Sequence, residues 1–331
     1  MTRPPAFWTR NTWQSRLLSP LSRITATITA HRLARPGWHA PIPVLCCGNA
    51  TVGGAGKTTL ALDLAHRLKN RGIAVHILLR GYRGTARGPR RVQPNDPASL
   101  TGDEALLLAQ IAPTWTGADR AASARAAIAA GAACLLMDDG LQNPSLHKTL
   151  SLLTIDGATG FGNGRVLPAG PLREPVASAA ARCRAAVLIG DDTSDARAQL
   201  PAALPVLHAT LAQGEEIAAL RGQRVLAFAG IAIPDKFFSA LDRAGAVLVD
   251  RSAFPDHHAF TAADLARLTE QAHAQNAILV TTPKDAVRLP AAMRASVQVI
   301  GVRLARRDEA EIEALLDNLL APSPPGARSM A

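Results

Sequence analysis

The segment 42–60, which reads IPVLCCGNATVGGAGKTTL, places the strongest constraint on how this chain can fold. Its apolar run 44–47 is typical of a strand buried in a parallel sheet, and apolar residues recur at helical spacing after the glycines. The glycines therefore lie in a turn from a strand to a helix. Backbone N–H groups at such a helix start can surround a phosphate. The segment predicts an α/β protein that binds a nucleoside triphosphate.

The positions of this loop have expected roles. Gly53, Gly54 and Gly56 lack the Cβ that would block the close approach of a phosphate. Lys57 would reach the β- and γ-phosphates, and the Thr58 hydroxyl would bind Mg²⁺. A glycine-rich connection without a ligand is the alternative. The other loop residues expected at the nucleotide are Thr51, Val52, Ala55 and Thr59.

Acidic residues occur at two further element boundaries. Asp138 and Asp139 follow the apolar run 133–137, and an acid at such a strand end can hold the Mg²⁺ of a nucleotide bound at the neighbouring loop. Asp103 and Glu104 begin a predicted helix, where acids can also serve only as caps worth about 1 kcal/mol. Both pairs are candidate site residues, because ligands bind at the strand ends of α/β sheets.

The second half of the chain contains two adjacent histidines, His257 and His258, in the sequence FPDHH. Neighbouring side chains diverge, so the pair alone is weak evidence for zinc, which needs further ligands. A histidine that pairs with a carboxylate across a domain cleft is the favoured interpretation, since it would complete a catalytic site when the domains close.

The composition is that of a globular protein with an anionic partner. The chain has 331 residues and a net charge of +10, with 48% hydrophobic and 19% charged residues. Such charge indicates nucleic acid, a phosphate-bearing substrate or a membrane surface. Only 4% of residues are aromatic, which argues against surfaces that stack on bases. The four cysteines have no C-x-x-C spacing, and a reducing cytosol is expected.

The segment 1–40 contains six arginines and no acid. Apolar spacing predicts two short amphipathic helices there, with Ser19 as N-cap of the second. Tryptophans and arginines suit a bilayer interface, so the segment is expected to be a membrane-interface anchor. Packing on the protein's own core is the alternative. No run approaches the length of a spanning helix, and the apolar core of a signal peptide is missing.

The alternation of strands and helices predicts a three-layer α/β/α domain with a glycine loop, followed by a second, smaller α/β/α domain. The expected boundaries are 41–205 for the first domain and 206–320 for the second, with a frayed tail at 321–331. Four arginines in loops are candidates for contacts with phosphate or acceptor, or are structural: Arg80, Arg83, Arg165 and Arg173.

In chain order, the motifs closely resemble those of the tetraacyldisaccharide 4′-kinases, the lipid A kinases of Gram-negative bacteria: GNATVGGAGKT, RGYRG, TGDE, DDGLQNPSL, GNGRVLPAGPLREP, FAGIAIPDKFF, FPDHH and TTPKDAVRL. The resemblance covers nearly the whole chain. Thr51 stands where the general P-loop pattern has glycine, and this is usual in the family. Two departures are Asn143, where histidine is frequent, and Pro283, where glutamate is common.

The resemblance implies transfer of the γ-phosphate of ATP to the 4′-hydroxyl of a tetraacylated glucosamine disaccharide 1-phosphate, at the cytoplasmic face of the inner membrane. It implies an anionic membrane surface, rather than nucleic acid, as the second partner. Asp103 would be the base for the acceptor hydroxyl, and His257 would pair with it. Asp138 and Asp139 would lie on the Mg²⁺ side, and Glu104 is a second candidate for metal or base.

Two other functions remain open from the residues alone. A membrane-associated regulatory GTPase would share the glycine loop, but its guanine pocket needs N-K-x-D, and here Lys284 is directly followed by Asp285. A kinase or ligase for a soluble substrate would share the fold and would not depend on an acylated acceptor.

Overall fold

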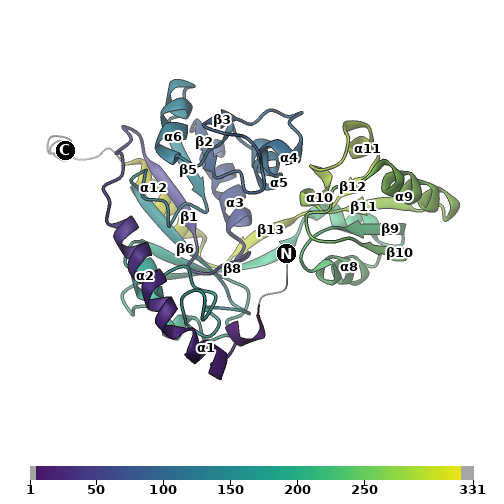
Figure 1. Cartoon of the computed structure of the whole chain (residues 1–331). Coiled ribbons are helices and arrows are strands. Elements are labelled where there is room, and N and C mark those ends of the chain that lie inside the picture. The colour runs from purple at the N-terminus through teal and green to yellow at the C-terminus, as the bar shows by residue number, and fades with distance from the viewer. Residues whose placement is uncertain (1–4, 322–331) are drawn as a thin grey trace.

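The computed structural model describes residues 5–321, which form two sheets that are each covered by helices (Figure 1). The larger sheet consists of β1 Val44–Gly48, β2 Val75–Leu79, β3 Arg90–Arg91, β4 Thr114–Thr116, β5 Cys134–Asp138, β6 Leu150–Asp156, β7 Ala185–Ile189, β8 Val206–Gln213 and β13 Val302–Arg306. These strands lie in the order β13-β8-β7-β6-β1-β5-β2-β4-β3. The pairs β3–β4 and β8–β13 are antiparallel, and the other pairs are parallel.

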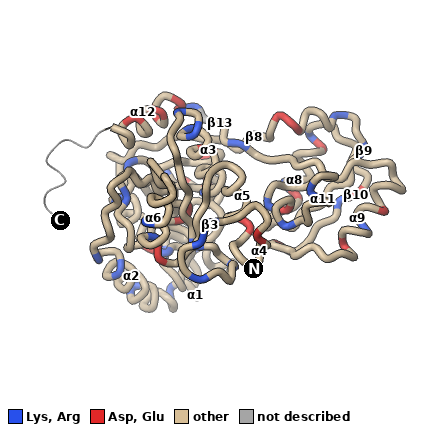
Figure 2. The backbone as a smooth tube through the Cα atoms, turned by 90° about the horizontal axis from the view of Figure 1, so that it is seen from above, with Lys and Arg blue, Asp and Glu red and all other residues tan. Residues whose placement is uncertain are grey.

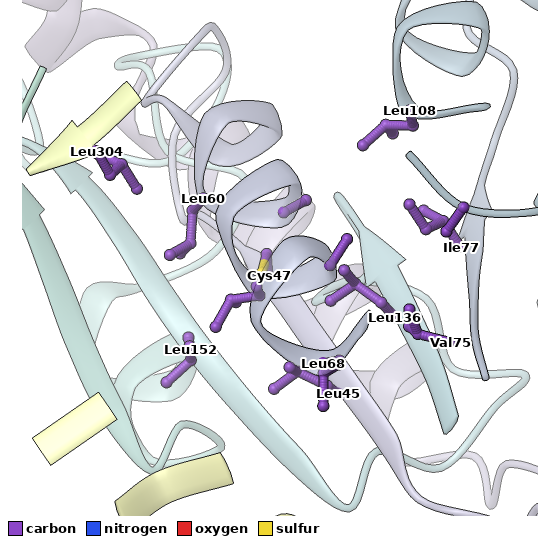
Figure 3. Packing of buried hydrophobic residues seen from close by; sticks show 14 of the residues in the cluster. Leu45, Cys47, Leu60, Leu68, Val75, Ile77, Leu108, Leu136, Leu152 and Leu304 are labelled. Carbon is purple, nitrogen blue, oxygen red and sulfur yellow. The ribbon is translucent and has the colours of Figure 1, made fainter. Parts of the chain in front are cut away.

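Helices cover both faces of this sheet, which confirms the predicted three-layer α/β fold. One face carries α3 Lys57–Asn70, α5 Asp103–Ala109 and α12 Glu309–Leu320, and the other carries α6 Arg120–Ala129 and α7 Val176–Ala180. Leucines at positions 60, 64 and 68 of α3 recur at i, i+4 spacing and are fully buried. They face strand residues such as Leu45, Leu136 and Leu152 (Figure 3).

The smaller sheet is entirely parallel in the order β10-β9-β11-β12. Its strands are β9 Arg224–Ala229, β10 Val247–Ala253, β11 Ile278–Thr281 and β12 Gln298–Val299. Phenylalanines of α8 Pro234–Arg243 pack on one face, and Leu268 of α9 Ala262–Ala274 packs on the other. The remaining short elements are α4 Ala98–Thr101, α10 Pro283–Ala286, α11 Ala291–Ser296, η1 Ala6–Trp8, η2 Arg197–Gln199 and η3 Glu215–Leu220.

The predicted boundary at residue 206 does not coincide with the division between the sheets. β8 pairs with β7, and β13 pairs with β8, so both strands extend the larger sheet. α12 returns to α3, where Arg67 Nη1 lies 2.7 Å from Glu309 Oε2. The smaller unit is therefore the insertion 214–301. Single strands do not encode their partners, because pairing is decided by long-range packing.

The N-terminal helices α1 Trp13–Leu17 and α2 Ser19–Leu33 lie along the surface of the larger unit (Figure 1). Their inward positions are polar or small, since Ser22 and Thr29 are buried. Their outward positions form an apolar stripe, which consists of Trp13, Leu17, Leu21, Ile24 and Ile28, each between 51% and 70% exposed. The side chains of this stripe therefore do not pack on the protein's own core.

Basic residues accompany this stripe, and α1 and α2 contain no Asp or Glu (Figure 2). The second helix begins one residue earlier than expected: Leu18 occupies the N-cap position, and Ser19 is the first helical residue. Thr12 caps α1 through a capping box with Ser15. None of the helices in residues 5–321 is long and apolar enough to cross a bilayer.

The strand expected at 297–302 is in fact two strands in different sheets, β12 and β13, and two short strands of the larger sheet, β3 and β4, were not predicted at all. β3 is only two residues long, and β4, with sequence TWT, pairs with β2 and β3 at the edge of the sheet. Both are too short to show an alternating pattern. The predicted tail 321–331 lies outside the described residues except for Ala321.

Candidate active site

The phosphate loop leaves β1 at the carboxyl edge of the larger sheet and enters α3. A Cβ on Gly53 or Gly54 would have no heavy atom within 4 Å, whereas a Cβ on Gly56 would lie 2.6 Å from Ile189 Cδ1. Glycine is favoured at position 56 chiefly by its left-handed backbone conformation, with φ of 78°, since the Ile189 methyl group could shift. Gly53 and Gly54 instead border open space, which is the arrangement a phosphate needs.

The side chain of Lys57 is fixed by polar contacts at the base of this loop. Its Nζ donates to Asn49 Oδ1 at 3.0 Å and to the Gly53 carbonyl at 3.2 Å, and it lies 3.7 Å from Asp139 Oδ1. The side chain is only 9% exposed. Asn49 also donates to Thr51 Oγ1 at 3.0 Å. A buried ammonium fixed in this way attracts anions to the loop.

Asp138 lies at the end of β5, beside the start of α3. Thr58 Oγ1 donates to its Oδ2 at 3.1 Å, while its buried Oδ1 has no hydrogen-bond partner among the described residues. Burial raises the pKa of Asp138 to about 7, and the negative charges of Glu104 and Asp139 add to this rise. A buried carboxylate oxygen without a donor, next to a hydroxyl, fits a Mg²⁺ ion.

The described residues contain no group of three or more His, Cys, Asp or Glu side chains arranged to hold a metal ion. A Mg²⁺ ion bound with a nucleotide needs only one or two protein groups, because it shares its ligands with phosphates and water. Thr58 and Asp138 are the pair that meets directly in this structure. The roles predicted for Asp139 and Glu104 at the metal stay predictions.

Asp139 is placed differently from its neighbour. Its backbone has a positive φ of 53°, and its side chain is 38% exposed. Arg173 Nη1 donates to Asp139 Oδ1 at 2.8 Å. Asp139 thus lies between two cations, Lys57 and Arg173, which places one of the four candidate arginines at the site.

The loop 161–175, which contains Arg173, packs directly against the phosphate loop. Val52 N donates to the Pro171 carbonyl at 2.8 Å, and Thr51 bridges to Leu172. The backbone N–H of Val52 is therefore committed to this contact in the structure. Glycine has more backbone freedom than other residues, so this contact restrains a loop that its own sequence leaves flexible.

The same loop also holds the N-terminal helices. Ser22 Oγ, on α2, donates to the Val166 carbonyl at 2.6 Å, and Trp8 Nε1 donates to the Pro168 carbonyl at 3.0 Å. Arg165 Nε donates to Asn11 Oδ1 at 2.8 Å. Arg165 therefore has a structural role.

The clearest contact between the two units joins Asp103 to His257. Asp103 is the first residue of α5 and is buried, and its Oδ2 lies 2.7 Å from His257 Nδ1. Burial alone would raise the pKa of Asp103, but the hydrogen bond and charge of His257, with the charges of Lys284 and Arg288, hold it below its ordinary value. The sequence-predicted pair is thus brought together by the fold.

Glu104 makes a second contact between the units. Its Oε1 lies 3.4 Å from Lys284 Nζ, and both side chains are more than a third exposed. Exposed pairs of this type contribute little to stability, about 1 kcal/mol or less. His258 faces away from His257 toward Asp264 Oδ2 at 3.0 Å, so the two adjacent histidines do not share a ligand.

Sequence reasoning missed Arg120, a buried cation of the larger unit. It is 3% exposed, its Nε has no hydrogen-bond partner among the described residues, and burial lowers its pKa to about 10. The charge of Arg80 lowers this pKa further. Of the arginines predicted from the sequence, Arg83 has its Cζ 5.9 Å from the ring centroid of Tyr82. No motif marks Arg120, because an arginine at the start of an alanine-rich helix is unexceptional in sequence.

The loop, the buried lysine and the strand-end carboxylate define a P-loop nucleotide-dependent enzyme. A family model described as tetraacyldisaccharide-1-P 4′-kinase matches residues 14–321. The chain therefore belongs to the tetraacyldisaccharide-1-P 4′-kinase family, and it is a kinase.

Related proteins agree along almost their full lengths. The tetraacyldisaccharide 4′-kinase of Gluconacetobacter diazotrophicus is 57% identical over 95% of this chain and 97% of its own length. That of Gluconobacter oxydans is 53% identical over 97% and 99%. The crystal structure of LpxK from Aquifex aeolicus in complex with ATP has a TM-score of 0.74 and 24% identity, covering 93% of this chain and 99% of that one. At this level of identity, the similarity to the solved structure shows that the two chains share a fold.

The raised pKa of Asp138 predicts a stability effect with a definite pH dependence. Between about pH 4 and pH 7 the folded protein keeps a proton on Asp138 that the unfolded chain releases, so the ionised carboxylate costs stability as pH rises through this window. We expect Asp138→Asn, in metal-free protein, to raise Tm by roughly 3 °C or more at about pH 8.

The gain should shrink toward zero as the pH falls to about 4. Thermal unfolding followed by circular dichroism in EDTA measures it. Asp139→Asn is the comparison: it removes one charge that raises the pKa of Asp138, but it also loses the ion pairs with Arg173 and Lys57, so its gain should be clearly smaller. An Asp138→Asn protein that melts at or below the wild-type temperature at every pH would show that the buried charge is not destabilising.

Proposed function

We propose that this kinase transfers the γ-phosphate of ATP to the 4′-hydroxyl of tetraacyldisaccharide 1-phosphate, which forms lipid IVA in lipid A biosynthesis. The observation that carries the proposal is the Asp103–His257 pair, a buried carboxylate held by a histidine from the other unit. Asp103 is followed directly by Glu104, whose negative charge raises the pKa of Asp138 in the phosphate site. The pair is therefore close to the phosphate site. The names of the close relatives support the identity of the acceptor.

ATP would bind with its phosphates in the loop 51–59, over the start of α3. Lys57 neutralises phosphate charge from its fixed position, and the N–H groups of the loop and helix start donate to phosphate oxygens. Thr58 and Asp138 would hold Mg²⁺, with Asp139 and Glu104 as further acids on that side. When bound, Mg²⁺ neutralises charge that develops on the transferred phosphoryl group.

Asp103 acts as the base that accepts the proton of the acceptor hydroxyl. Its lowered pKa makes it a weak base, so its contribution lies mainly in orientation. His257 contacts Oδ2 of Asp103 at 2.7 Å, and the backbone N–H of Glu104 donates to Oδ1 at 3.0 Å, so both carboxylate oxygens are oriented. Phosphoryl transfer has a loose transition state that depends on positioning and charge more than on a strong base, which suits this arrangement.

The segment 1–40 serves as an anchor at the cytoplasmic face of the inner membrane. The apolar stripe of α1 and α2 is exposed, and basic residues accompany it without acids. A helix of a soluble protein turns its apolar face inward, so the reversed orientation here supports burial in a bilayer interface. The basic residues would meet anionic lipid headgroups. The protein would thus be peripheral and would reach its lipid acceptor from the membrane surface.

Acceptor dependence tests the proposed reaction. Purified full-length protein should consume ATP only in the presence of Mg²⁺ and an acylated glucosamine disaccharide 1-phosphate, with transfer of labelled γ-phosphate to the lipid. The matched control is the same disaccharide without acyl chains, presented at equal concentration. ATP consumption that is equal with both, or that is independent of either, would contradict the proposal.

Replacement of the base should separate chemistry from nucleotide binding. We expect Asp103→Ala to lower kcat by about 10² or more, because positioned acid–base groups contribute on this scale. The Kd for ATP, measured by calorimetry, should change less than about twofold, since Asp103 is outside the phosphate loop. Glu104→Ala in the same assay ranks the two acids. Normal turnover by Asp103→Ala would make the base assignment wrong.

The anchor is tested on the intact chain with substitutions in its exposed stripe. The variant Leu17→Gln/Ile24→Gln/Ile28→Gln should bind vesicles of phosphatidylglycerol and phosphatidylethanolamine at least about tenfold more weakly, because three apolar side chains no longer enter the interface. Flotation with such vesicles measures this. Thr25→Gln/Thr27→Gln, on the same helix outside the stripe, is the control. Unchanged flotation of the triple variant would rule out this anchor.

A further inference from the structure

The motif TTPKDAVRL contains a buried ion pair that the phosphate site does not use. Asp285 Oδ1 and Arg288 Nη2 lie 2.7 Å apart, and their side chains are 0% and 6% exposed. A buried pair is costly to desolvate and is retained where its geometry satisfies further polar groups. This pair does so, because both residues hydrogen-bond to Gly230 and Arg288 also bonds to the turn that carries His257.

Gly230, at the end of β9, is the point where these contacts converge. Asp285 Oδ1 accepts from Gly230 N at 2.9 Å, and Arg288 Nη2 donates to the Gly230 carbonyl at 2.9 Å. The same carbonyl accepts from His257 N at 3.0 Å. Arg288 Nη1 also donates to the His258 carbonyl at 3.0 Å. Arg288 therefore binds the carbonyl to which His257 N donates, and it also binds the carbonyl of the next residue, His258.

His257 needs such support because its backbone is in the left-handed region, with φ of 62°. A non-glycine residue keeps that conformation only when its surroundings determine it. Close packing adds to the restraint, since a Cβ on Gly230 would lie 3.1 Å from Asp285 Oδ1 and 3.2 Å from His258 Cβ. Thr282 Oγ1 completes the cluster by donating to Asp285 Oδ2 at 2.6 Å.

We infer that Arg288 and Asp285 are positioning residues, which act on the reaction by holding His257 in the backbone conformation that meets Asp103. Neither residue touches the reacting groups in this structure. The inference rests on the proposed role of the Asp103–His257 pair. It adds that the orientation of His257 is set by contacts within the smaller unit, which do not involve α5.

The variant Arg288→Lys tests this while keeping the positive charge. A lysine has no planar fork and cannot donate to Asp285, Gly230 and His258 at once. We expect kcat to fall about tenfold or more, with KM for ATP changed less than about twofold, because a misplaced group costs rate rather than nucleotide binding. Arg294→Lys is the matched control, since Arg294 also donates to two carbonyls of the same unit, at 3.1 Å and 3.0 Å.

A double-mutant cycle shows whether Arg288 acts through His257. In a His257→Ala background, Arg288→Lys should cause little further loss of kcat, because the group that it positions is gone. An equal loss in both backgrounds, or no loss in the wild type, would overturn the inference. Gly230→Ala provides a second route if Arg288→Lys does not fold, since its methyl group displaces the same turn without changing any charge.

The cycle also separates this inference from the proposed function. If His257→Ala alone retains full kcat, the role of the Asp103–His257 pair is wrong and the inference is overturned with it. If His257→Ala lowers kcat and the effects of the two substitutions are additive, only the positioning role of Arg288 is wrong.

Discussion

The parallel register of β1 with β5 is the constraint on which the site depends. Cys47 is paired with Asp138, so the last residue of one strand lies beside the end of the other, where the phosphate loop begins. Parallel strands end at the same edge, and the carboxylate is therefore delivered to the helix start that carries Thr58. The hydrogen bond between Thr58 and Asp138 is the result of this register. A shift by one residue would turn the carboxylate to the other face.

Much of this arrangement could be predicted from the sequence, because it depends on local pattern. The limits of β2, β7 and α12 follow from apolar runs and helical spacing, and the strand-to-helix turn at 48–57 follows from its glycines. The approach of Asp103 to His257 was expected only through the family resemblance. Residues separated by more than 150 positions meet through tertiary packing, which no local pattern encodes.

The sequence was least informative where function depends on long-range pairing or on a single buried group. The sequence pattern predicted a strand at β8 but a single strand at 297–302 in place of β12 and β13. The chain enters the smaller unit after β8 and returns from it through β13, and these two strands pair antiparallel in the larger sheet. Arg120 stands in an unremarkable alanine-rich stretch, and Arg288 stands in a family motif, but neither position indicates in sequence that the arginine is buried. A buried cation is expensive, so its presence points to a partner, but burial itself is a property of the fold.

The loop 161–175 contacts α2 through Val166 and the phosphate loop through Pro171, and only four residues separate these two contacts. With α2 lying in the bilayer interface as proposed, this short span fixes how high the nucleotide stands above the lipid plane. The enzyme would then select its acceptor by the distance of the sugar hydroxyl from the membrane plane as well as by its chemical groups. A sugar hydroxyl carried too near the acyl chains, or too far into the cytosol, would miss the phosphate even if every group on the acceptor were correct.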